Sequence, residues 1–432
     1  MVVQPPGVAR RVGGADDGAG GKGGVWRSVG HRGTLRGVSS SDIPPGSAGE
    51  PHDQGASELR NAPKFRTDRS HYRAALERWL QGAFPSRQGL TVADIEIPVS
   101  TGFSNETVIL DAAWTENGSE REERLVVRIE PADGGMFPPQ TPQCAVSVEL
   151  QYRAMKAVAE AGAAPVPPLL GYEPDPAVLG APFFVMGFVG GRVPADVPRY
   201  TEAGFVVDEA TPAQRRRMVL SAIEVIAGIH SLDWRKAGLA WLDPSRTGDP
   251  TTALQIGLYR DHVHSELAGR EHPVLYAALD WLEANDPGDE RVGLTWGDAR
   301  LGNIILQDYR TTAVLDWEVC ALSPTEADMG WWLMFDRMSF DDLGIDRLDG
   351  YPTRDEMISH YEQVSGRTVR DPHYWEVFGA MRFCTIFIRL GDRLTAAGFV
   401  PPERNPAVGN QVTAALARLL DIDNPTPDLL AR

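Results

Sequence analysis

The sequence has little cysteine, no long apolar run and no excess of basic residues. Only three cysteines occur in 432 residues, Cys144, Cys320 and Cys384, and they are widely spaced and odd in number. This usage argues against a disulfide framework and against a cysteine-type metal site. It favours buried thiols in a reducing compartment.

The missing apolar and basic segments exclude two further classes of protein. The longest apolar stretch, 181–189, is about nine residues long and far short of the roughly twenty that span a bilayer. The N-terminus lacks the apolar core of a secretory signal, so we expect a cytoplasmic protein that does not enter a membrane. The net charge of −17 argues against nucleic acid as a partner. An acidic surface suits a cationic small molecule, but it also simply keeps proteins in solution.

The N-terminal segment differs in composition from the rest of the chain. Residues 1–60 hold 14 of the 44 glycines, and they have almost no periodic apolar pattern. Such a segment buries too little surface to offset its ordering entropy. We therefore predict that residues 1–65 are disordered. A start codon assigned upstream of the true one and a regulatory tail are the alternatives.

Apolar periodicity predicts a sheet followed by helices. From Ser70 the apolar residues recur at helical spacing, and short strand-like runs separated by turn residues then predict an antiparallel sheet of about five strands. The predicted strands include 95–97, 107–110, 125–129 and 183–186, and helices are predicted at 70–80, 146–160, 212–234, within 254–283 and within 355–420. With 42% hydrophobic and 23% charged residues, the chain is long enough for one large or two ordinary domains.

The segment 294–318 is the most informative part of the sequence. It places Asp298, then Asn303 five residues later, then Asp316 thirteen residues further on, each beside an apolar strand-like run. Phosphoryl transfer needs positioning and charge neutralisation more than covalent help from the protein. Asp298 would receive or orient the proton of an acceptor hydroxyl, whereas Asn303 and Asp316 offer oxygen ligands to Mg²⁺ bridging nucleotide phosphates. The spacing therefore predicts a phosphotransfer site.

The same residues resemble a known catalytic pattern. Trp-Gly-Asp at 296–298, Asn303, and Asp-Trp-Glu at 316–318 resemble the motifs of the aminoglycoside phosphotransferase-like family, a branch of the protein-kinase-like fold. Within that family the chain is most similar to proteins related to the kinase-like domain fused to some acyl-CoA dehydrogenases. The resemblance begins near residue 95. It implies an α+β fold with a small β-rich N-lobe and a larger helical C-lobe, and ATP and Mg²⁺ as cofactors.

The resemblance also assigns a phosphate-covering turn. The segment 100–107 lies between two predicted strands, at the place of this turn in the family. Gly102 would permit close approach of the backbone, and Ser104 and Asn105 would donate hydrogen bonds to phosphate oxygens. An ordinary hairpin turn would explain the same residues without a ligand.

Two other parts of the predicted N-lobe are implied to bind nucleotide. Arg128 stands where protein kinases have a phosphate-holding Lys, and Glu149 is implied as its partner, so the two side chains are expected to meet. The segment 184–192 looks like the interlobe hinge, where Met186 and Phe188 would supply apolar walls for adenine. Surface charges and a buried strand ending in a glycine turn are the structural alternatives.

Three residues are expected to support the catalytic loop. Trp296 would pack and donate from its indole nitrogen, and Asp328 would brace the loop through backbone amides. His230 is expected to pack beneath the loop and not to act as a general base. Arg300 points at the acceptor, at a γ-phosphate or at a structural carboxylate, and of these a structural ion pair is expected.

These inferences predict one two-lobe unit, with an N-lobe at 90–187 and a C-lobe at 188–425. The helices within 254–283 are expected to line the acceptor pocket, and Trp331 is expected to be a core residue. The predicted activity is an ATP- and Mg²⁺-dependent transfer of a phosphoryl group to a hydroxyl of a small molecule. A nucleotide-binding pseudokinase without turnover and a protein-interaction module are the alternatives. The residues leave open the acceptor, ATP versus GTP, and the oligomeric state.

Overall fold

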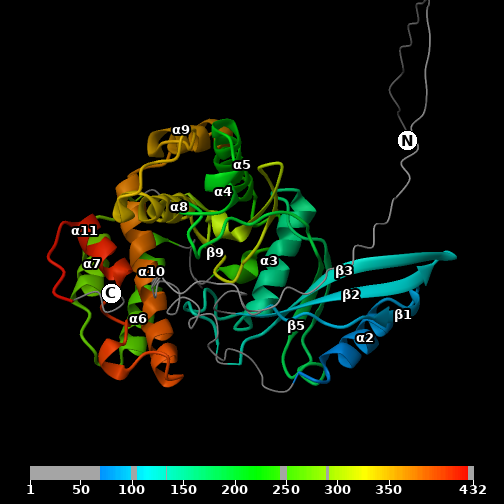
Figure 1. Ribbon diagram of the computed structural model, residues 1–432. Coiled ribbons are helices and arrows are strands. Elements are labelled where there is room, and N and C mark those ends of the chain that lie inside the picture. The colour runs from blue at the N-terminus through cyan, green and yellow to red at the C-terminus, as the bar shows by residue number, and fades with distance from the viewer. Residues whose placement is uncertain (1–68, 99–104, 133, 244–250, 289–290, 427–432) are drawn as a thin grey trace, which may run out of the picture. The chain divides into compact units, whose positions relative to one another are not determined.

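The computed structural model describes residues 69–98, 105–132, 134–243, 251–288 and 291–426 of the chain (Figure 1). All of them fall within one unit, His52–Arg432. An antiparallel sheet with two helices comes first, and a larger, mostly helical part follows. This arrangement confirms the α+β fold predicted from the sequence. The disorder predicted for residues 1–65 lies outside the described residues.

The small lobe is built on a five-stranded sheet of order β1-β2-β3-β5-β4, in which every pair of neighbours is antiparallel. Its strands are β1 Gln88–Val92, β2 Glu106–Glu116, β3 Ser119–Ile129, β4 Leu169–Glu173 and β5 Phe183–Gly187. Asn117 and Gly118 close the β2–β3 hairpin with positive φ angles of 51° and 76°. These angles match the two-residue turn that suits the twist of paired strands.

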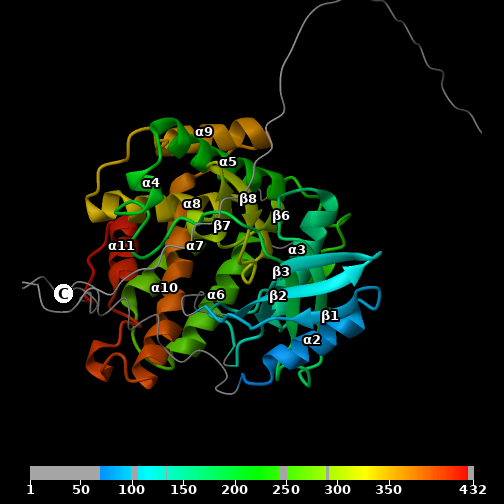
Figure 2. The same cartoon turned by 45° about the vertical axis from the view of Figure 1, so that its right-hand side comes forward.

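Two helices cover opposite faces of this sheet. Residues 183 and 185 of β5 pack into a cluster with α2 (Tyr72–Ala83), whereas residues 184 and 186 pack into the cluster that holds α3 (Ser147–Ala161). This is the alternation expected of a strand buried on both sides. In Figures 1 and 2, α2 and α3 accordingly lie on different sides of the strands.

The predicted helices of the small lobe are confirmed, but one predicted strand is wrong. Tyr72, Leu76 and Leu80 of α2 have no exposed surface, as their spacing indicated. The segment 95–97 forms only a single bridge, between Glu96 and Ile109. The edge strand is β1 instead, in which only alternate residues near its end are buried. Such a short pattern gives little signal in the sequence.

The large lobe consists mainly of helices packed around α10. Its helices are α4 Phe205–Asp208, α5 Pro212–His230, α6 Thr252–Leu267, α7 Pro273–Ala284, α8 Glu326–Ser339, α9 Arg354–Ser365, α10 Pro372–Ala396 and α11 Gln411–Leu420. Figures 1 and 2 show α10 against α8 on one side and near α6, α7 and α11 on the other. Gly330 permits the close crossing of α8 and α10, because a Cβ there would collide with the backbone of Trp375. No helix in the described ranges has both the length and the hydropathy needed to cross a membrane.

Two short strand pairs in the large lobe carry the loops of interest. β6 (Val292–Thr295) pairs with β9 (Ala321–Pro324), and β7 (Ile304–Gln307) pairs with β8 (Arg310–Val314). The loop 296–303 leaves β6 and enters β7 through one 3-10 turn at Leu301–Asn303. Asp316 follows β8 by two residues. The strand pairs thus fix the loops that carry Asp298, Asn303 and Asp316.

Candidate functional site

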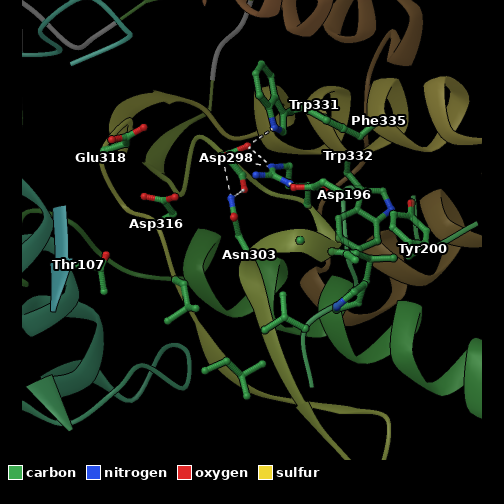
Figure 3. A pocket seen from close by; sticks show the side chains of 18 of the residues that line it. Thr107, Asp196, Tyr200, Asp298, Asn303, Asp316, Glu318, Trp331, Trp332 and Phe335 are labelled. Atoms are coloured by element: carbon green, nitrogen blue, oxygen red, sulfur yellow. Dashed lines mark hydrogen bonds and ion pairs between the residues drawn. The ribbon is translucent and has the colours of Figure 1, made fainter. Parts of the chain in front are cut away.

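A cavity of about 990 Å³ lies between the small-lobe sheet and helices α8 and α10. Six of the predicted site residues line it: Arg128, Met186, Phe188, Asp298, Asn303 and Asp316. Figure 3 shows Asp298, Asn303 and Asp316 around the same space, with Thr107 on the small-lobe side. The structure therefore brings together the three side chains on which the sequence-based prediction rested.

Asp298 is held by three donor groups. The indole Nε1 of Trp331 donates to its Oδ1 at 2.8 Å, and the amide Nδ2 of Asn303 donates to its Oδ2 at 2.6 Å. The Nε of Arg300 lies 3.1 and 3.3 Å from the two oxygens. A carboxylate has about four acceptor positions, and these four contacts occupy two on each oxygen. An acceptor hydroxyl in the cavity would therefore replace one of them, and the Arg300 contacts are the longest.

Asn303 is oriented by the same contact. Its Nδ2 donates both to the Asp298 carboxylate and, at 3.1 Å, to the Asp298 backbone oxygen. Both contacts use the nitrogen, which leaves the amide oxygen as the atom able to bind a cation. The side chain is only 5% exposed, and it lines the cavity.

Asp316 has a rare backbone conformation and a partly buried carboxylate, whose side chain is 23% exposed. Its φ of 60° lies in the left-handed region, which aspartate enters more easily than most residues. Burial raises the pKa of its carboxyl group, Arg128 opposes the rise, and Asp298 adds to it. Strained backbone that is kept in place occurs most often at functional sites. A divalent cation beside this carboxylate would stabilise its charged form.

The described residues allow a magnesium site that is shared with phosphates. They contain no group of three or more His, Cys, Asp or Glu side chains placed to hold an ion by themselves. Mg²⁺ in nucleotide sites typically takes one or two protein oxygens and completes its octahedron with phosphate oxygens and water. The Asn303 amide oxygen and the Asp316 carboxylate fit such a two-ligand set.

Arg128 lies at the cavity, but the expected pair with Glu149 is wrong. Its guanidinium donates to Thr107 Oγ1 at 3.0 Å and to Asp316 Oδ1 at 3.2 Å. Glu149 instead accepts from Arg153, one turn later on α3, and from the hydroxyl of Tyr172 at 3.5 Å. Arg153 holds Glu149 because it lies four residues later on the same helix. Glu149 is not among the residues that line the cavity.

Of the predicted phosphate-covering turn, 100–107, the structure describes only residues 105–107. Gly102 and Ser104 lie outside the described residues. Asn105 is 1% exposed, and its amide Nδ2 donates to Glu318 Oε2 at 3.2 Å. The expected donation from this amide to phosphate is therefore not supported, because the large-lobe carboxylate takes the amide and the residue does not line the cavity.

The predicted supports of the catalytic loop are confirmed. Asp328 accepts hydrogen bonds from the backbone nitrogens of Trp296 and Gly297 at 2.7 and 2.8 Å. His230 contacts the same carboxylate at 3.0 Å through Nε2 and the hydroxyl of Tyr361 at 2.7 Å through Nδ1. The indole of Trp296 donates to the backbone oxygen of residue 315 at 2.8 Å.

Gly297 explains why this loop can lie so close to the segment that follows Asp316. Its φ is 87°, and a Cβ at this position would collide with the backbone oxygen of Val319. Only glycine combines that conformation with that approach.

Two features of the site were not expected from the sequence. Trp331 is a buried residue, as predicted, but it also donates to Asp298. Arg300 forms the expected ion pair in an unexpected form, because it joins Asp298 to Asp196, which contacts its NH1 at 2.7 and 2.8 Å. Sequence distances of 33 and 104 residues separate these partners, and no local pattern reports contacts of that range. The prediction that helices within 254–283 line the pocket is wrong for the described residues: α8 and α10 line it instead.

The cavity has an apolar compartment beside the small-lobe sheet. Apolar side chains of β2, β3, β5 and the loop after β8 line it: Ile109, Val126, Phe184, Met186 and Leu315. Phe188 is 45% exposed and stacks under the guanidinium of Arg124 at 5.0 Å. A flat aromatic base could pack between these walls.

The comparisons with known proteins define the family. The model of the phosphotransferase enzyme family matches residues 96–364, which is more than half of the chain. The chain belongs to this family. A Ralstonia eutropha protein assigned as an aminoglycoside phosphotransferase has a similar structure, with a TM-score of 0.59 and 23% identity over 81% of this chain and 99% of that one. This likeness confirms the protein-kinase-like two-lobe fold.

Curated relatives carry the same unit as part of longer chains. The chain is 28% identical to acyl-CoA dehydrogenase family member 11 of Gallus gallus over 333 residues, covering 74% of this chain and 38% of the relative. The Homo sapiens protein of the same name is 26% identical over 344 residues, covering 77% and 40%. The chain thus spans about two fifths of these relatives. The similarity to this branch of the family is as predicted.

Proposed function

We propose that this protein is an ATP- and Mg²⁺-dependent phosphotransferase that moves the γ-phosphoryl group to a hydroxyl of a small molecule. The observation that carries the proposal is the convergence of Asp298, Asn303 and Asp316 on one cavity, with Arg128 beside Asp316. Membership of a phosphotransferase family supports phosphoryl transfer in general. In this proposal the boundary between the N-lobe and the C-lobe stays between residues 187 and 188. The N-lobe, predicted to begin at residue 90, is extended to include α2.

The proposed roles follow from the hydrogen bonds of each group. Asp298 accepts the hydrogen bond of the acceptor hydroxyl in place of one of its Arg300 contacts, which aims the oxygen at the phosphorus. The bond from phosphorus to the departing ADP oxygen breaks, the bond to the acceptor oxygen forms, and the hydroxyl proton leaves by way of Asp298 to water. Asn303 and Asp316 hold the metal, which when bound neutralises phosphate charge.

Arg128 is proposed to hold nucleotide phosphates. A guanidinium keeps its charge permanently and binds oxyanions with two parallel donors, so its replacement of a Lys does not by itself remove this function. Met186 and Phe188 are proposed to form walls of the adenine site. Gly102 and Ser104 are still proposed to contact phosphate. A cytoplasmic location is also part of the proposal.

The test is acceptor-dependent ADP release by Asp298→Asn, compared with Asp355→Asn at an exposed first-turn position of α9. We expect a fall in kcat of about a hundredfold to ten-thousandfold for Asp298→Asn, the usual contribution of a positioned acid or base. Thermal stabilisation by ADP and Mg²⁺ should persist in both variants. Nucleotide stabilisation without turnover on any hydroxyl compound would establish the pseudokinase alternative, and no stabilisation by nucleotide would favour the interaction module.

A second measurement tests the metal ligands. In Asp316→Ala, Mg²⁺ should no longer increase the thermal shift caused by ADP. An unchanged Mg²⁺-dependent shift would refute the metal assignment.

A further inference from the structure

The half of the cavity beyond Asp298 has an apolar, aromatic wall. In Figure 3, Trp331, Trp332 and Phe335 lie on the other side of Asp298 from Thr107 and Asp316. Apolar side chains of the segment after β3, of α8 and of α10 line this half: Met136, Phe137, Trp331, Trp332, Phe335, Phe383 and Ile386. Polar residues, among them Tyr200 beside Trp332, also line the cavity, but the wall itself binds apolar surface.

Each carboxylate in the described lining of this half already has a guanidinium partner. Arg300 contacts both Asp196 and Asp298, and Arg347 binds Asp336 through two hydrogen bonds of 2.7 and 3.0 Å. An ammonium group that entered the pocket would have to compete with these arginines for the same oxygens. The net charge of −17 therefore does not translate into a cation-binding pocket here.

Arginines also lie against two rings of the aromatic wall. Arg382 is 4% exposed, its hydrogen bonds go to the neutral oxygens of Tyr259 and Gly297, and its guanidinium lies 4.7 Å from the ring centre of Trp331. Arg300 lies 5.5 Å from the ring centre of Phe335. Aromatic rings recognise cations through their faces. The positive charge of these two guanidinium groups opposes a second cation at the rings of Trp331 and Phe335.

The segment after β3 is anchored so that Phe137 closes this wall. Arg393 of α10 donates to the backbone oxygen of Gly134 at 2.9 Å, and Arg389 donates to that of Gly135. Glu266 of α6 holds Arg389 at 2.8 and 2.9 Å. The ring of Phe137 then lies 6.4 Å from that of Trp331, measured between centroids.

We infer that the acceptor is a hydroxyl compound with an apolar body and no ammonium group, and that Phe137 is a specificity-determining residue which packs against that body. The inference rests on the proposed phosphotransfer function and goes further, because it names the chemistry of the acceptor. Polycationic amino sugars and small quaternary amines are disfavoured by the arginine-paired carboxylates and by the arginines against Trp331 and Phe335.

The experiment measures ADP release from ATP and Mg²⁺ with two sets of probes. The apolar set is 2-phenylethanol, cyclohexylmethanol and 1-octanol, and the cationic set is kanamycin and choline. We expect saturable stimulation by at least one alcohol and none by the cations. Stimulation by a cation but no alcohol overturns the inference. An absence of stimulation by all five compounds also overturns the inference. If ADP and Mg²⁺ still raise the melting temperature in that case, nucleotide binding by the proposed site is retained.

A matched pair of variants tests the role of Phe137. Phe137→Ala should raise KM for the active alcohol roughly tenfold, as expected for the loss of one aromatic contact, with KM for ATP unchanged. Phe399→Ala is the control, because Phe399 is also half-buried and does not line the cavity. Equal acceptor KM values for the two variants overturn the assignment of Phe137, and both folds are checked by their melting temperatures.

Discussion

Replacing Asp328 by alanine should cost more stability than any surface carboxylate can. Asp328 has no exposed surface, and its carboxylate accepts from two backbone nitrogens of the catalytic loop and from His230. In the alanine variant, all three donors would stay buried without this acceptor. Unsatisfied buried donors cost free energy because water no longer solvates them.

The expected loss follows from these three contacts. A hydrogen bond to a charged group contributes about 1.5–3 kcal/mol, and three independent ones would contribute about 5–9 kcal/mol. Contacts that share one carboxylate are not independent, so we expect a loss of about 4–6 kcal/mol. Domains are stable by about 5–15 kcal/mol in total, so the variant should be close to unfolding.

The assay is urea denaturation followed by tryptophan fluorescence. Asp355→Ala is the matched control, because Asp355 is also in the first turn of a helix but is exposed. Asp355→Ala loses the same kind of helix-dipole contribution, about 0.3–1 kcal/mol, but no buried hydrogen bonds. A difference in unfolding free energy below about 1 kcal/mol between the two variants would refute the bracing role of Asp328.

Three further predictions concern backbone, phosphate binding and pH. Gly297→Ala should lose at least about 2 kcal/mol more unfolding free energy in urea than Gly118→Ala, because both have positive φ but only Gly297 lies against backbone; equal losses would contradict the steric argument. Arg128→Met should raise the Kd of ADP with Mg²⁺ about tenfold or more by calorimetry, and an unchanged Kd would remove Arg128 from the phosphate site. Burial lowers the pKa of His272 to about 4, and its Nδ1 accepts from a backbone nitrogen at 3.3 Å. As the pH falls, His272 is protonated in the unfolded chain before it is protonated in the folded one. Its contribution to the unfolding free energy is therefore full above pH 6.5 and falls by up to about 3 kcal/mol towards pH 4. His272→Asn, which can still cap α7, should reduce the pH dependence of the unfolding free energy, and the same dependence in both proteins would contradict the assignment.

The parts of the site that follow local sequence patterns could be predicted. Asp298, Asn303 and Asp316 lie at the ends of short apolar strands, so their spacing was enough to place them on neighbouring loops. Asp328 opens a helix directly after β9, and His230 closes α5, which made supporting roles predictable for both.

Contacts that depend on tertiary packing could not be predicted. The pair of Glu149 with Arg153 is a local i,i+4 contact that helix periodicity does indicate, whereas the contact of Arg128 with Asp316 joins residues 188 positions apart. The apolar residues around Trp331 in the sequence predict a core residue. Nothing in the sequence indicates that its indole nitrogen donates to Asp298. The anchoring of Gly134 and Gly135 by α10 joins residues more than 250 positions apart. Side chains at such separations meet by topology, which residue periodicity does not encode.

The anchoring of the segment after β3 on α10 restricts how the cavity can open. Besides the chain at 188–191 and the contacts of Arg389 and Arg393, the small lobe is attached by a hydrogen bond from Thr141 to the backbone oxygen of Trp241 and by one from the backbone nitrogen of Val314 to the backbone oxygen of Pro165. Beside the loops that carry Asp298 and Asp316, the hydrogen bonds from Asn105 to Glu318 and from Arg128 to Asp316 also join the lobes. Separation of the lobes at these loops therefore has to break at least these last two hydrogen bonds.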